Sequence, residues 1–181
     1  MSTDFIKALD GLVAQAAGDW RVFLRKLGPV HAQWHTEHNG GIATLGFLLF
    51  HWELINRFKA VGADGGLGGL NGITAYTETQ LANFGAPYDV TDGVSAGDAA
   101  ALEQFSGDVE AWHNDAHMEI GNAVHHNLMN PRTNVRRHEF WQLHYFINDQ
   151  LAPALTRYAP GAAEADTIAT LEADPAVAPN V

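Results

Sequence analysis

Histidines occupy positions where the interior of a helix would otherwise carry leucine or isoleucine, and this placement constrains the fold more than any other feature of the chain. His113 and His117 have the i, i+4 spacing within a stripe of apolar residues at helical intervals. His51 and His144 lie in apolar stripes of the same kind. Because a buried imidazole costs free energy unless its ring nitrogens have partners, the fold must supply partners to these side chains in its core.

Helical periodicity also organises the first third of the chain. One helix is expected over residues 5–16, and a second helical stretch covers 20–38, where Gly28-Pro29 interrupts or kinks it. The sequence Asn39-Gly40-Gly41 then stops this stretch. A further helix is expected over residues 44–60.

The segment that follows these helices differs from them in composition and periodicity. Residues 61–97 are rich in glycine and lack strong periodicity, which is typical of a functional loop. Asp108 can cap a helix with a strong apolar face. Asn134 can cap the last strong helix, which slows or ends at Pro153.

Length and pattern together predict an all-α chain with a four-helix bundle core. We expect a single domain over residues 1–159. An acidic tail rich in Ala and Pro follows over residues 160–181 and is expected to pack loosely.

Composition excludes several classes of protein. The 181 residues include 10 Lys and Arg against 21 Asp and Glu, which gives a net charge of −11. Without a basic stripe the chain is not expected to bind nucleic acid or an anionic membrane, and without cysteine it has neither disulfides nor thiolate ligands. The segment from Met1 to Trp20 lacks the features of a signal peptide, which favours a cytoplasmic location.

Two histidine pairs have a spacing that suits metal chelation. His31 with His35, and His113 with His117, each place two imidazoles on one face of a helix. A third histidine from a neighbouring helix would complete each set. Two such triads facing each other would hold two metal ions, and imidazole ligands without carboxylate or thiolate suit copper or zinc.

Three motifs in sequence order resemble those of the tyrosinase, catechol oxidase and hemocyanin superfamily, the coupled binuclear copper proteins. Phe47 to His51 resembles the first-copper motif FLPWH. Trp112 to His117 resembles the second-copper motif LHNxxH, and Phe140 to His144 resembles FWLHH. The resemblance is to a short, divergent member of bacterial type, and it implies a helical bundle that holds two copper ions.

The resemblance implies three histidine ligands for each copper ion. The first copper would take His51 and two of the upstream histidines. Helical geometry favours His31 and His35 for these two places, with His38 as the alternate for either. The second copper would take the remaining set: His113, His117 and His144.

The resemblance also implies an activity. Asn114 and Glu103 match the residues that orient a proton-accepting water in the family. The chain is then expected to be a copper-dependent oxidase that uses O2 to oxidise phenols, o-diphenols or o-aminophenols to o-quinone-type products. Its partners would be a small phenolic substrate and O2, with a copper-delivery protein as a further partner that the family allows.

Three alternatives use the same residues differently. A hemocyanin-like protein would bind O2 without oxidase activity through the same ligands. A non-haem di-iron bundle would use Glu110 of an ExxH pattern and Asp149 of an HxxxxD pattern, but the sequence has neither an HxxxE nor a second ExxH. A metal-free interaction module would need hydrogen bonds alone to satisfy the histidines in the core.

Overall fold

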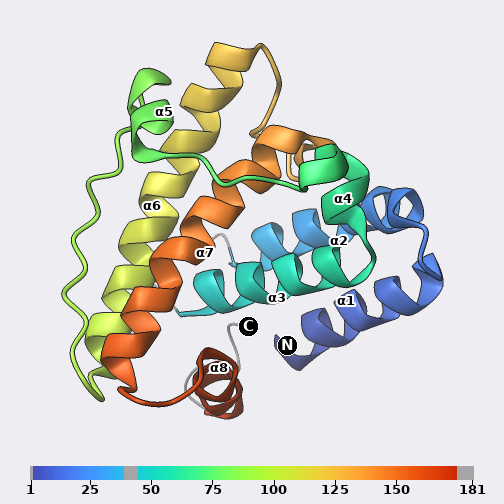
Figure 1. Ribbon diagram of the computed structural model, residues 1–181. Helices are drawn as coiled ribbons and strands as arrows, with labels where there is room; N and C mark the ends of the chain where they lie inside the picture. The colour runs from blue at the N-terminus through green and yellow to red at the C-terminus, as the bar shows by residue number, and fades with distance from the viewer. Residues whose placement is uncertain (1, 39–44, 175–181) are drawn as a thin grey trace.

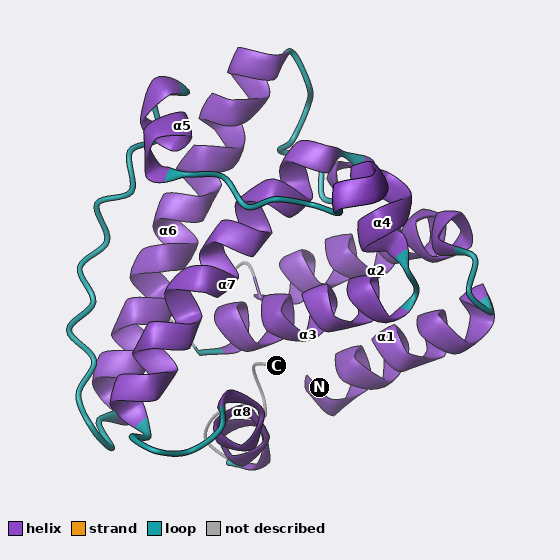
Figure 2. Ribbon diagram, in the orientation of Figure 1, coloured by secondary structure: helices purple, strands orange, loops and turns teal. Residues whose placement is uncertain are grey.

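The computed structural model describes residues 2–38 and 45–174, and all of the regular secondary structure in these ranges is helical (Figure 2). The all-α prediction is therefore confirmed. No helix in the described ranges has both the length and the apolarity needed to cross a membrane. The elements are α1 (Ser2–Ala16), α2 (Trp20–His38), α3 (Gly46–Ala60), α4 (Ala63–Gly68), η1 (Gly69–Asn71), α5 (Glu78–Asn83), α6 (Ala99–Val124), η2 (Asn134–Arg136), α7 (His138–Tyr158) and α8 (Glu164–Ala173).

Helix α3 is the centre of the helical bundle. It packs against α1, α6 and α7, while α6 and α7 lie side by side along the opposite face from α1 (Figure 1). Stacked aromatic rings join α3 to two of its neighbours. Phe50 stacks on Trp34 of α2 with ring centroids 4.3 Å apart, and Phe58 stacks on Trp141 of α7 at 3.7 Å. These contacts hold α2, α3 and α7 in fixed relation.

Helix α2 continues through Gly28-Pro29, where we expected an interruption or a kink. Proline has no N–H to donate, so the carbonyl of Arg25 four residues earlier loses its helical partner. The Arg136 guanidinium donates to this carbonyl at 3.4 Å and replaces the missing bond. Gly28 lets the backbone carrying Arg132 pack directly against α2. Gly28-Pro29, a pair that disfavours a helix in isolation, is thus the place where α2 contacts the segment before α7.

Helix α6 begins well before Asp108, so the predicted cap is wrong. Asp98 is the N-cap, and its carboxylate accepts a hydrogen bond from the backbone N–H of Ala101 at 3.0 Å. Leu102 and Phe105 are buried and extend the apolar face towards the N-terminus. Both aspartates fit the rule for a cap, and the packing of this extra apolar stretch decides between them.

Helix α7 differs from the prediction at both ends. Asn134 does not cap it, because its buried side chain donates to the carbonyl of Leu128 at 3.0 Å, and the helix starts at His138. Pro153 does not end the helix either. Buried residues such as Leu155 follow it, so burial of the last turns outweighs the hydrogen bond that proline removes.

The glycine-rich segment 61–97 contains two short α-helices and the 3-10 helix η1, and it is attached to the bundle. The carboxylate of Asp64 accepts hydrogen bonds from the Tyr145 hydroxyl of α7 at 2.7 Å and from the backbone N–H of Ile73 at 3.0 Å. Thr77 and Gln80 form a capping box at the start of α5. The segment is thus partly helical rather than a loop throughout.

The described part of the tail also has more structure than we expected. Helix α8 buries Ile168 and Leu171 and packs against α7. The indole N–H of Trp52 on α3 donates to the Glu164 carboxylate at 2.6 Å. The tail is therefore docked on the bundle as far as residue 174.

The close contact between α2 and the segment before α7 predicts the effect of a small substitution. A Cβ atom on Gly28 would overlap the carbonyl oxygen of Arg132. We expect Gly28→Ala to lower the free energy of unfolding by about 1–3 kcal/mol, measured by denaturant titration. Gly65→Ala is the matched control, because the new methyl group would meet no atom within 4 Å. Equal stability of the two variants would contradict the contact.

Candidate metal centre

Six histidines from four helices meet in the interior of the bundle. They come from α2, α3, α6 and α7, and five of them are buried while His35 is half-buried. The centroids of neighbouring rings lie 4.3 Å apart for His113 and His117 and 4.8 Å apart for His51 and His144. The full cluster is His31, His35, His51, His113, His117 and His144.

The ring nitrogens form two overlapping groups that could each hold a metal ion. In each group the three nitrogens lie within 4.8 Å of one another, and His51 belongs to both: His31, His35 and His51 form one, and His51, His113 and His144 form the other. The Nε2 atoms of His31 and His35 are 3.0 Å apart, and those of His113 and His144 are 3.2 Å apart. Two imidazoles bound tetrahedrally to one ion would place their nitrogens about 3.3 Å apart.

Backbone carbonyls fix the tautomer of three histidines. A carbonyl oxygen only accepts, so the Nδ1 atom facing it must carry the proton, and the Nε2 lone pair then points towards the cluster. The same arrangement orients histidine ligands in metal sites. The Nδ1–H donates from His31 to Pro131 at 3.0 Å, from His51 to Phe47 at 2.7 Å and from His144 to Phe140 at 2.6 Å.

Three ring nitrogens in the cluster are buried without a hydrogen-bond partner among the described residues. The most informative is Nε2 of His51, the residue that both groups share. Its proton is on Nδ1, so the orphaned Nε2 holds a lone pair and has no donor to accept from. The Nδ1 atoms of His113 and His117 are also unpartnered. Each such atom costs about 1–3 kcal/mol when buried, and a metal ion would satisfy the lone pair of His51.

Burial keeps these imidazoles neutral, which is the form that binds a metal. Burial, together with the charge of nearby His35, lowers the pKa of His117 to about 3. Burial likewise lowers the pKa well below the ordinary value for His31, His51, His113 and His144, and neighbouring histidines add to the effect.

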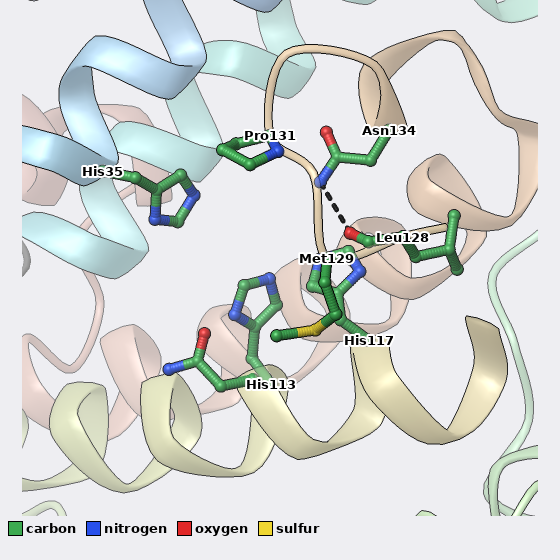
Figure 3. A pocket seen from close by; sticks show the side chains of 8 residues that line it. His35, His113, His117, Leu128, Met129, Pro131 and Asn134 are labelled. Carbon is green, nitrogen blue, oxygen red and sulfur yellow. Dashed lines mark hydrogen bonds between the residues drawn. The ribbon is translucent and has the colours of Figure 1, made fainter. Parts of the chain in front are cut away.

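A pocket of about 140 Å³ connects the cluster with the surface. Figure 3 shows His35 of α2 across the pocket from His113 and His117 of α6, with the chain from Leu128 to Asn134 forming another wall. Asn114 and Met129 line the same pocket and are exposed. The pocket therefore lies beside three of the six histidines. The lining residues are His35, His113, Asn114, His117, Leu128, Met129, Pro131 and Asn134.

The structure brings all six predicted ligands into one cluster, where one of the two groups of nitrogens has the predicted members and the other does not. His31, His35 and His51 form one group as expected for the first ion. In the second group, His51 stands where we expected His117. The ring of His117 lies beside this group, 5.3 Å from the ring of His144. The side chain of His38 lies outside the described part of the structure.

The two predicted catalytic residues are far apart. Asn114 lines the pocket. Glu103 lies on the same continuous helix, ten residues before His113, which corresponds to about 15 Å along the helix axis. Glu103 and Asn114 therefore do not meet at one water molecule.

Sequence patterns did not reveal the contribution of the segment before α7. Pro131 orients His31 through its backbone carbonyl, and Asn134 lines the pocket with a side chain that we had expected to cap a helix. Every residue has a backbone carbonyl, so the residue type does not show that this one accepts a hydrogen bond from His31. The buried asparagine could have been singled out only by knowing that its surroundings are apolar.

Comparisons with known proteins do not identify the site. No family model, no curated protein and no solved structure matches the chain. The fold and the site define an all-helical protein with a buried, histidine-only candidate metal centre.

The lowered pKa values predict how the stability of the metal-free protein depends on pH. Histidine in an unfolded chain has a pKa near 6.5, and the pKa values of these histidines are lower in the folded chain. Below about pH 6.5 the unfolded state therefore binds more protons than the folded state. The free energy of unfolding should fall between pH 7 and 5 by up to about 1.4 kcal/mol per pH unit for each such histidine. Denaturant titrations in the presence of a chelator test this.

A variant with one buried histidine fewer provides the control. His117→Leu should show a shallower decrease over the same pH range, because it removes one of the groups with a lowered pKa. A free energy of unfolding that stays constant between pH 7 and 5 in the original protein would contradict the assignment.

Proposed function

We propose that the histidine cluster holds two copper ions and that the protein is a copper-dependent oxidase. It would use O2 to oxidise phenols, o-diphenols or o-aminophenols to o-quinone-type products. The observation that carries the proposal is the buried, unpartnered Nε2 of His51, a lone pair at the centre of two groups of imidazole nitrogens.

The donor set supports copper over other metals. Both groups consist of histidine alone, and the chain has no cysteine. Imidazole ligands suit copper and zinc better than magnesium, calcium or manganese, which prefer oxygen. Zinc has no redox chemistry, whereas the motifs at His51, His113 and His144 resemble those of oxygen-handling dicopper proteins.

The chain's own residues would bind and orient the substrate. When bound, copper would supply the site for O2 and accept electrons from the phenolic oxygen. The pocket between α6 and the segment from Leu128 would hold the ring of the substrate beside His113. Asn114 lies at this pocket and would orient the water that receives the phenolic proton. The aromatic side chains of Phe47 and Phe140, which pack against cluster histidines, would exclude other water.

The pocket favours an oxidase over an oxygen carrier. A carrier must keep phenols away from its metal ions, but here exposed Asn114 and buried His113 line one pocket. A di-iron site is disfavoured for a different reason. Neither Glu110 nor Asp149 belongs to a group of potential ligands among the described residues.

Metal analysis and an oxidase assay test the proposal directly. We expect the purified protein to contain about two copper ions per chain and to form o-quinone steadily from 4-methylcatechol. His51→Ala should lower the copper content to about one per chain or less, because His51 contributes to both groups.

The control for this measurement is His125→Asn. His125 is exposed at the C-cap of α6 with a positive φ that asparagine tolerates, and it belongs to neither group. This variant should keep its copper. Two iron ions per chain would refute the proposal, and copper without turnover of the diphenol would favour the carrier.

The two predicted catalytic residues should respond differently to substitution. We expect Asn114→Ala to lower kcat/KM for a monophenol at least about tenfold, because the water would lose its partner. Glu103→Gln should leave kcat/KM within about twofold, because the residue lies about 15 Å along α6 from His113. Equal losses in both variants would contradict this separation of roles.

A further inference from the structure

The pocket beside the histidine cluster is lined by a thioether as well as by imidazoles. Met129 belongs to the chain segment that forms one wall of the pocket, and His113 and His117 of α6 line the same pocket. In Figure 3 the Met129 side chain extends from this segment towards α6. Met129 is 55% exposed, although methionine is one of the residues most often buried in proteins. The fold thus presents a sulfur atom both to solvent and to the pocket.

Hydrogen bonds hold the backbone around Met129 in place. The N–H of Met129 donates to the side-chain oxygen of Asn127 at 3.2 Å. The carbonyl of Leu128 accepts from the side-chain amide of buried Asn134 at 3.0 Å. The segment that carries the thioether is therefore fixed to the protein on the side where it faces the histidines.

His113 adds a lone pair to the same pocket. Burial lowers the pKa of His113 and of His144 well below the ordinary value, so both rings are neutral at pH 7. Nδ1 of His144 donates to the Phe140 carbonyl, which leaves Nε2 of His144 as an acceptor. Nε2 of His113, 3.2 Å away, must then carry the proton of its ring. Nδ1 of His113 therefore has a lone pair, and this buried atom has no hydrogen-bond partner among the described residues.

His117 contributes a further nitrogen. It belongs to neither of the two groups of three imidazole nitrogens found among the described residues, and its buried Nδ1 is also without a hydrogen-bond partner there. Because His117 lines the pocket with His113 and Met129, two imidazoles outside their hydrogen-bonding capacity lie beside one thioether.

These donors suit a soft, monovalent metal ion. Thioether sulfur selects Cu(I), whereas magnesium and calcium prefer carboxylate and carbonyl oxygen. Among the described residues, none of those that line the pocket carries a carboxylate. The net charge of −11 raises the concentration of cations near the protein. The pocket therefore has the chemistry of a place where copper is first captured.

We propose that Cu(I) enters through the pocket, where it first binds the Met129 thioether and Nδ1 of His113 and of His117, and then moves inward to the two groups of imidazole nitrogens. We call these three donors the entry site. A neutral imidazole has one lone pair, so His113 cannot serve the entry site and an inner group at the same time. When the ion moves inward, the proton of His113 moves to Nδ1 and no electron is transferred. The inference rests on the proposed function for copper as the resident metal.

The rate of copper uptake tests the entry site. Metal-free protein is mixed without oxygen with Cu(I) held by bicinchoninate, and the loss of the coloured chelate is followed over time. We expect Met129→Leu to slow uptake at least about tenfold, since losing even a supporting partner of a metal ligand weakens binding by that factor. The final copper content should not change. Met118→Leu is the control, because Met118 is exposed on α6 but does not line the pocket, and it should load at the original rate.

A variant without the shared inner ligand isolates the entry site at equilibrium. His51→Ala removes a member of both inner groups and leaves the three donors of the entry site in place. X-ray absorption of its Cu(I) complex should show sulfur bound to copper. Adding Met129→Leu should remove this signal and weaken Cu(I) binding at least about tenfold. Circular dichroism checks that the variants are folded, and the uptake rates test the inference independently of them.

The outcomes separate this inference from the oxidase proposal. Cu(I) binding that depends on Met129, in a protein that does not retain two copper ions, would refute the dicopper oxidase and keep the entry site. Two copper ions per chain, taken up at equal rates by the original protein and Met129→Leu, would overturn the inference and keep the oxidase. A Cu(I) complex of His51→Ala without sulfur bound to copper would also overturn the inference.

Discussion

The removal of imidazole rings from water is the constraint on which the rest of this structure depends. The interior must supply a partner for every ring nitrogen that loses its contact with solvent. The helices meet part of this requirement with their own backbone. The carbonyls of Phe47 and Phe140 accept from histidines four residues later in α3 and α7. This bond directs their remaining lone pairs towards a common centre, where the unpartnered Nε2 of His51 belongs to both groups that could hold a metal ion.

A second contact, between α2 and the segment before α7, links several features that lie apart in the sequence. Pro29 leaves the carbonyl of Arg25 without a helical partner, and Arg136 supplies one. The glycine before it allows close approach of the backbone at Arg132. The adjoining carbonyl of Pro131 then fixes the tautomer of His31. The tautomer of a candidate ligand and one wall of the pocket thus depend on a single packing contact.

Local sequence rules predicted the helices more reliably than their boundaries. Apolar stripes identified α3, α6 and α7, because the side chains that pack inwards must recur at the helical period. Caps were less certain, since Asp98 and Asp108 both satisfy the same rule and only the burial of Leu102 and Phe105 distinguishes them. Pro153 likewise stayed within a helix because packing of the residues after it outweighs one lost hydrogen bond.

The sequence by itself determined which residues could form the site: histidines on apolar faces, no cysteine, and spacings that place paired imidazoles on one side of a helix. The physical reason is that helical period and side-chain chemistry are local properties. Only the tertiary structure decided which nitrogens meet, because the distance between atoms on different helices depends on packing. It made His51 the member common to both groups and left Glu103 far along α6. It also brought the backbone of Arg132 against Gly28 and the carbonyl of Pro131 against His31, across more than half of the chain.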